Sequence, residues 1–174
     1  MFFSTQKVIK KEWLIFLLIT TIAYLIIKFS PSLLALSLPD SDSYVHPSAY
    51  RAAIYPSFID FFEFLKINIV DLQILILSLS ISSLCMTLFH LKTQKLLILI
   101  FFLIISLNIF YSSFSKTLLP ESIFFSCINF AFSLYLLKKK EFIHYLFLGI
   151  LFGLILTIKK IGIAVVAIFI LIFI

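Results

Sequence analysis

The residues best suited to chemistry lie in one polar stretch, residues 38–56, of an otherwise apolar chain. Asp40 and Asp42 stand two positions apart, and such carboxylates can bind a hard divalent cation, or one can act as a general base. A solvated turn is the simpler interpretation of an isolated Asp-x-Asp. Arg51 is the single arginine of the chain, and its guanidinium could bind a phosphate with two hydrogen bonds or anchor to lipid headgroups. His46 could tune a neighbouring carboxylate, although a lone histidine in a loop is more often a bystander.

Three charged residues in later segments extend this set of candidates. Glu121 follows Pro120 at the start of an apolar run, where a carboxylate in the first turn of a helix would stabilise the helix dipole. Lys159 and Lys160 separate the last two apolar runs. Their ammonium groups could pair with an anionic lipid headgroup or simply extend to the membrane surface.

Four uncharged residues inside apolar runs have structural interpretations. Asn108 and Asn129 are expected to form hydrogen bonds between helices. Cys85 and Cys127 are expected to be packed free thiols, because their spacing is not that of a metal site. The chain also contains no nucleophile elbow, phosphate-binding loop or zinc-ligand spacing.

The composition indicates whether the chain folds in water or in a membrane. It is 63% hydrophobic and 13% charged, whereas soluble domains are roughly 45–50% apolar and about 25% charged. The net charge of +6 comes from short lysine clusters between apolar runs, which is typical of cytoplasmic loops and not of a nucleic-acid-binding face. We therefore predict an integral, multi-pass membrane protein that binds no nucleic acid.

The apolar runs predict an all-α membrane protein with about five to six transmembrane helices and a polar, partly helical first extracytoplasmic loop. The expected segments are a cytoplasmic tail (1–12), transmembrane helices (13–29, 69–91, 96–111, 121–137 and 142–158), an extracytoplasmic loop (30–68) and a partial transmembrane helix (161–174). Within the loop, an interfacial helix is expected to turn Phe58, Phe61, Phe62 and Leu65 to one face.

The lysine distribution predicts the orientation. The expected cytoplasmic segments hold eight Lys or Arg residues and the expected outer segments six, so the N-terminus is predicted to be cytoplasmic in the inner, cytoplasmic membrane. The last apolar run of about 14 residues is short for a span, which favours an incomplete protein.

Several short motifs resemble those of bacterial GT-C-type membrane glycosyltransferases, in a family-39-like arrangement. The polar stretch reads Leu38-Pro-Asp-Ser-Asp-Ser-Tyr44, followed by Arg51 and Tyr55-Pro56. It is similar to the Pro-Asp-Ser-x-x-Tyr and Arg…Tyr-Pro segments of the family's first outer loop. The resemblance continues at the positions Gln73, Glu121-Ser122, Leu148-Gly149…Gly153-Leu154 and Lys159-Lys160-Ile-Gly162. It covers about residues 8 to 165, which correspond to the N-terminal portion of the family's members.

The resemblance implies transfer of a sugar from a polyprenyl-phosphate carrier to an acceptor at the outer face of the membrane. Asp40 would be the base that deprotonates the acceptor hydroxyl, with Asp42 as the alternative, and Glu121 would position the site. Arg51 and Lys159 or Lys160 would hold the carrier phosphate. The implied substrate- and phosphate-binding residues together are Tyr44, Arg51, Tyr55, Lys159 and Lys160.

Cofactors, partners and competing functions follow from the same residues. A divalent cation, if one is used, would bind at Asp40 and Asp42; the partners would be the lipid bilayer, the polyprenyl-phosphate-linked sugar donor and other membrane proteins. The competing hypothesis is a non-catalytic polytopic membrane protein, such as an assembly partner or the product of a gene remnant. A transporter is disfavoured, because the spans carry almost no mid-membrane charge and show no matched pair of broken helices.

Overall fold

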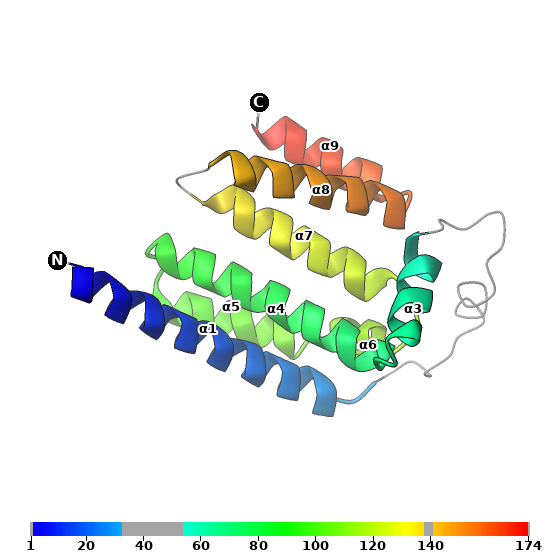
Figure 1. Ribbon diagram of the computed structural model, residues 1–174, viewed down its shortest axis with the longest axis horizontal. Helices are drawn as coiled ribbons and strands as arrows, with labels where there is room; N and C mark the ends of the chain where they lie inside the picture. The colour runs from blue at the N-terminus through cyan, green and yellow to red at the C-terminus, as the bar shows by residue number, and fades with distance from the viewer. Residues whose placement is uncertain (1, 33–53, 138–140, 174) are drawn as a thin grey trace.

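The structure is a computed structural model that describes residues 2–32, 54–137 and 141–173 (Figure 1). Over these ranges it contains helices and no strand, which confirms the predicted all-helical fold. The helices are α1 (Phe2–Phe29), α3 (Ile54–Phe64), α4 (Ile69–His90), α5 (Lys95–Ser106), α6 (Ile109–Ser115), α7 (Glu121–Leu136), α8 (Phe142–Ile158) and α9 (Gly162–Phe173).

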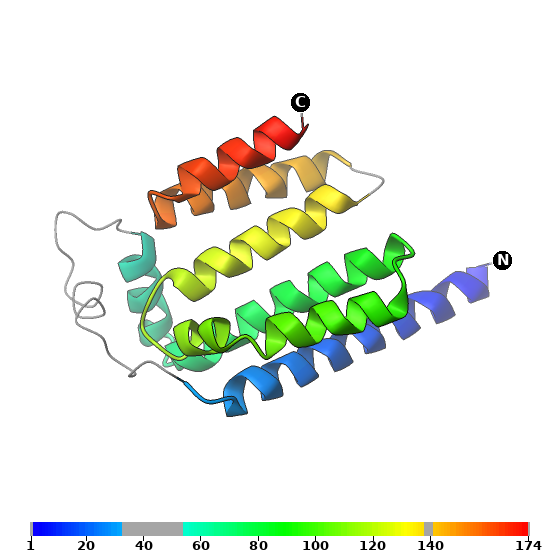
Figure 2. The same ribbon diagram turned by 180° about the vertical axis from the view of Figure 1, so that it is seen from behind.

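Helix α4 is the centre of the bundle. It contacts α1 on one side and α7 on the other, α8 packs on α7, and α9 packs on α8. Figures 1 and 2 show these helices as a row, with α5 behind α4 in the first view and in front of it in the second. Short helices α3 and α6 cover one end of the bundle, where α1 and α8 end and where α4, α7 and α9 begin. We call this the α3 end, and the other the opposite end.

Two helices are long and apolar enough to cross a membrane, namely α4 and the Lys11–Phe29 part of α1. Helices α5 and α6 would add a third if they form one span bent by 50°. Helices α7, α8 and α9 are also apolar but shorter. The described part of the chain therefore has the helices of a membrane protein.

Small polar side chains are buried along α4, and Ser80 is one that faces α7. Ser78, Ser80 and Ser82 are fully buried, and their hydroxyls donate to carbonyls of their own helix at 2.7–2.8 Å. Residues of this size let two helix backbones approach closely without leaving a polar group unpaired. Asn129 of α7 donates from Nδ2 to Ser80 Oγ of α4 at 3.2 Å, which is the interhelical bond that the sequence predicts.

Asn108 has a different role from the one that was predicted. The expected helix over residues 96–111 is divided into α5 and α6, and Asn108 stands at the N-cap of α6. Its side-chain oxygen accepts from the backbone N–H groups of Phe110 and Tyr111 at 2.9 and 3.3 Å. Asparagine is among the best N-cap residues because its side chain satisfies donors that a helix start leaves free, so the helix restarts here.

Helix α3 packs part of its apolar surface against the rest of the bundle, and Phe58 and Phe62 of the expected apolar face contribute to that packing. Tyr55 and Ile59 are buried, while Phe61 is 57% exposed and Leu65 is 45% exposed. The buried pair packs with Ile69 at the start of α4 and with Leu119. Phe58 and Phe62 thus lie beside the buried pair, while Phe61 and Leu65 stay on the surface of the bundle.

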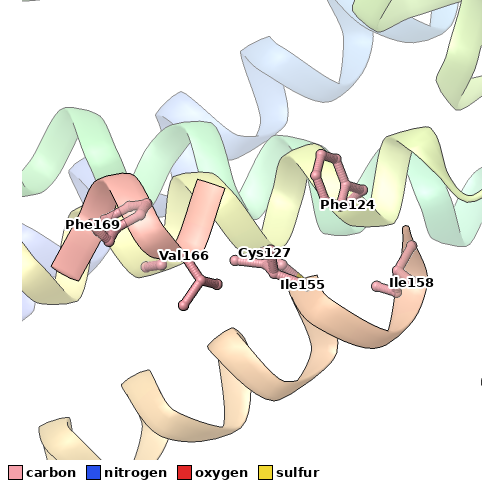
Figure 3. Packing of buried hydrophobic residues seen from close by; sticks show 7 residues of the cluster. Phe124, Cys127, Ile155, Ile158, Val166 and Phe169 are labelled. Carbon is pink, nitrogen blue, oxygen red and sulfur yellow. The ribbon is translucent and has the colours of Figure 1, made fainter. Parts of the chain in front are cut away.

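One hydrophobic core lies among α7, α8 and α9 (Figure 3). It contains Phe124, Cys127, Ala131, Ile155, Ile158, Val166 and Phe169. Cys85 is buried in the core between α1, α4 and α5. Both cysteines are thus buried free thiols, as predicted.

We predict that Gly162→Ala destabilises the α8–α9 hairpin. A Cβ at Gly162 would lie 2.1 Å from the backbone oxygen of Ile155, so one of the two backbones must move. Overpacking of this kind costs roughly 1–3 kcal/mol. The measurement is the temperature at which the detergent-solubilised protein loses its monodisperse elution.

Gly153→Ala is the matched control, because a Cβ there meets no atom within 4 Å. We expect its stability to be unchanged or slightly raised, since alanine is the better helix former. Equal losses in both variants would contradict a specific close approach at Gly162.

Candidate functional site

The sequence candidates divide into those that the structure describes and those that it does not. Asp40, Asp42, Tyr44, His46 and Arg51 lie outside the described residues, so their predicted roles stay predictions. The remaining candidates are Tyr55, Glu121, Lys159 and Lys160. They belong to α3, to the first residue of α7 and to the segment after α8, and these elements meet at the α3 end (Figures 1 and 2).

A buried glutamine of α4 joins two of these elements, α3 and α7. Gln73, near the start of α4, is fully buried. Its Nε2 donates to Tyr55 Oη of α3 and to the backbone oxygen of Leu119 at 3.2 Å. Ser122 Oγ of α7 donates to the backbone oxygen of Gln73 at 3.5 Å. Tyr55, Gln73 and Ser122 come from three motifs that the resemblance groups together, and the fold brings them into contact.

Glu121 and Lys159 form an ion pair that joins α7 to the end of α8. The Lys159 ammonium donates to Glu121 Oε1, and the two side chains are 31% and 18% exposed, Lys159 first. Glu121 lies in the first turn of α7, where its charge also stabilises the helix dipole, as the sequence suggests. The pair spans 38 positions of the sequence, so neither residue's partner could be inferred from local spacing.

The neighbouring Lys160 is in a different environment. Its side chain is exposed, and its ammonium makes no hydrogen bond or ion pair within the described ranges. Lys159 is the C-cap of α8 in an extended backbone conformation, with φ −143° and ψ 142°, so adjacent side chains point in different directions. Among the residues that the structure describes, Lys160 is thus the one of the two lysines whose positive charge is left to meet an anion.

Two other lysines at the α3 end are engaged within the protein. Lys28 of α1 forms an ion pair with Asp71 of α4 at 2.9 Å, and Tyr24 donates to the same carboxylate oxygen at 3.1 Å. Lys116 follows α6 and donates to the backbone oxygen of Ser30. Burial lowers the pKa of the Lys116 ammonium from its ordinary value. These bonds tie α1 to α4 and to the end of α6, and no local motif in the sequence predicts them.

Two buried acceptor atoms at the α3 end have no donor among the described residues. Glu121 Oε2 and Gln73 Oε1 are both buried and lack a hydrogen-bond partner in the part of the chain that the structure describes. An unpaired buried acceptor costs about 1–3 kcal/mol, more when it is charged. Such groups are therefore suited to accept a hydrogen bond from a hydroxyl that enters the site.

A metal centre is not formed by the described residues, which contain no group of three or more His, Cys, Asp or Glu residues placed to hold a metal ion. The predicted cation ligands, Asp40 and Asp42, lie outside these residues. The expectation of a divalent cation therefore rests on the sequence alone.

Comparisons with protein-family models, with curated proteins and with solved structures found no match to this chain.

We predict that the Glu121–Lys159 pair stabilises the protein as a unit. Glu121→Gln and Lys159→Met should each lower the thermal stability, and the double variant should lose less than the sum of the two. Residues in one ion pair typically show coupling of about 0.5–3 kcal/mol. The measurement is thermal unfolding of the four proteins of the double-mutant cycle in detergent.

The control cycle replaces Lys159→Met with Lys160→Met, because Lys160 is exposed and unpaired in the described ranges. The losses of thermal stability caused by Glu121→Gln and Lys160→Met are expected to be additive. If the losses of thermal stability caused by Glu121→Gln and Lys159→Met were also additive, the observed ion pair would contribute no coupling energy.

Proposed function

We propose that this chain is a GT-C-like membrane glycosyltransferase that transfers a sugar from a polyprenyl-phosphate carrier to an acceptor at the outer face of the membrane. The proposal rests on the motif resemblance together with one observation. Tyr55, Gln73, Glu121, Ser122 and Lys159, which four separate motifs contribute, lie on elements that meet at the α3 end.

In the proposed reaction, a carboxylate removes a proton and cationic side chains stabilise the leaving phosphate. Asp40, or Asp42 in the alternative register, takes the proton from the acceptor hydroxyl as it attacks the anomeric carbon of the sugar. The carrier phosphate leaves with the bonding electron pair, and Arg51 and Lys160 stabilise its charge. Fixed positive charge on a leaving phosphate and a carboxylate within reach of the attacking hydroxyl are what such a transfer requires.

Glu121 is proposed to position the substrates. Lys159 holds one oxygen of its carboxylate, while the other oxygen is buried and has no donor in the described part of the chain. A sugar or acceptor hydroxyl could donate to that oxygen, as another could to Gln73 Oε1. The lysine thus orients the carboxylate, which is the usual way in which a supporting ion pair contributes to a polar site.

We propose the following membrane arrangement. The chain crosses the inner membrane about five to six times with its N-terminus in the cytoplasm, which puts the α3 end at the outer face. The supporting observation is that successive long helices run in alternating directions (Figure 1). The lysines of the segment 91–95 and of residues 138–140 then fall on the cytoplasmic side.

The orientation predicts opposite accessibility for two engineered cysteines. A membrane-impermeant maleimide added to intact cells should label Ser43→Cys and should label Lys139→Cys only after the cells are opened. The buried native Cys85 and Cys127 keep the background low. Labelling of both positions from the same side would contradict the proposed grouping of residues 38–56 with the α3 end.

The transfer mechanism predicts that Asp40→Asn lowers the rate by about 10²–10⁴-fold, since that is the usual contribution of a general base. The measurement is incorporation of labelled sugar by membranes supplied with polyprenyl-phosphate-linked hexoses and pentoses. Asp60→Asn is the matched control, because Asp60 is exposed on α3. We expect that variant to keep full activity.

Asp42→Asn distinguishes the two registers, since a larger loss in this variant would assign the base to Asp42. Undiminished transfer in both variants, with normal membrane insertion, would contradict catalysis by this pair. Absence of transfer by the unaltered chain with every donor would favour the non-catalytic membrane protein.

A further inference from the structure

A hollow lies at the opposite end of the bundle, away from the candidate site. It has a volume of about 290 Å³ and is lined by Glu12, Trp13, Phe16, Ser83, Met86, Thr87, His90, Ser133, Leu134 and Leu137. These residues belong to the first half of α1 and to the last turns of α4 and α7. The end of α4 forms its floor, because α1 and α7 both pack on α4 but make no close contact with each other.

Its walls are apolar and its polar groups are few. The hydroxyls of Thr87 and Ser133 donate to helix carbonyls at 3.0 and 2.9 Å, so they leave a mostly hydrocarbon surface. Glu12 carries the carboxylate of the lining, and it makes no ion pair or hydrogen bond within the described ranges. His90 is exposed at the end of α4, and its imidazole can donate a hydrogen bond.

The chemistry of the lining indicates what can occupy the hollow. A flexible hydrocarbon chain can follow a mostly apolar groove of this kind, and the carboxylate of Glu12 can bind a cationic headgroup at its edge. Trp13, which is 61% exposed, has the side chain that is enriched at the level of lipid headgroups.

We propose that this hollow binds one phospholipid whose headgroup carries both a phosphate and a primary ammonium. The ammonium would donate to Glu12, the phosphate would accept from His90, and one acyl chain would lie over α4 between α1 and α7. A primary ammonium has three hydrogen-bond donors for a carboxylate. A trimethylated ammonium has none, and a glycerol headgroup has no positive charge.

The test is native mass spectrometry of the full chain released from micelles that contain equal amounts of phosphatidylethanolamine, phosphatidylcholine and phosphatidylglycerol with identical acyl chains. We expect one bound phosphatidylethanolamine, preferred about three- to tenfold over the other two, as a charge-assisted hydrogen bond would give. Glu12→Gln should abolish that preference.

Glu141→Gln is the matched control, because Glu141 is an exposed carboxylate at the same end of the bundle and does not line the hollow. It should leave the preference unchanged. Ser83→Phe, which fills the hollow, should reduce retention of all three lipids, with helix content by circular dichroism as the check on folding.

Three results would overturn the proposal. One is preferred binding of phosphatidylcholine or phosphatidylglycerol by the unaltered protein. Another is an undiminished preference in Glu12→Gln. The third is that the unaltered protein retains no lipid. Loss of a dimer of this chain in Ser83→Phe, in place of a loss of lipid, would show that a second copy occupies the hollow.

Discussion

Burial of polar side chains where water is scarce is the constraint on which the rest of this bundle depends. The central helix α4 carries fully buried Gln73, Ser78, Ser80 and Ser82, each of which must find a partner within the protein. The serines donate to carbonyls of their own helix, and Ser80 also accepts from Asn129 of α7. Gln73 uses α3 and the segment before α7. The polar pattern of one helix thus determines which elements surround it.

The apolar runs predicted the helices well because long hydrocarbon surface in a short chain has few alternatives to helix formation. They could not predict how a polar residue inside a run would be used. Asn108 and Asn129 have the same side chain in similar surroundings, yet one caps a helix and the other bonds to Ser80. Gly153 and Gly162 likewise differ, since only the latter lies against a neighbouring backbone. In both cases the difference is set by tertiary contacts that a single sequence does not contain.

The candidate site shows the same limit. Motif resemblance alone suggested that Tyr55, Gln73, Glu121 and Lys159 belong together, because their contacts join positions 18 to 49 residues apart. The resemblance left Lys159 and Lys160 as equal candidates for binding the carrier phosphate. The geometry separates them through the extended C-cap of α8, which turns Lys159 to Glu121 and leaves Lys160 exposed. Asp40, Asp42, Tyr44 and Arg51 lie outside the described residues, so their roles rest on sequence.

The polar bonds between elements are concentrated at one end of the bundle. At the α3 end, Lys28 joins α1 to α4, Gln73 joins α4 to α3, and Lys159 joins α8 to α7. At the opposite end, the bond from Thr87 to the backbone oxygen of Ser133 joins α4 to α7 at 3.4 Å, and α1 and α7 leave a hollow between them. Reacting groups must be held within a fraction of an ångström, whereas an acyl chain needs only a loose apolar surface. The bonded end is therefore the one suited to chemistry, and the open end is suited to lipid.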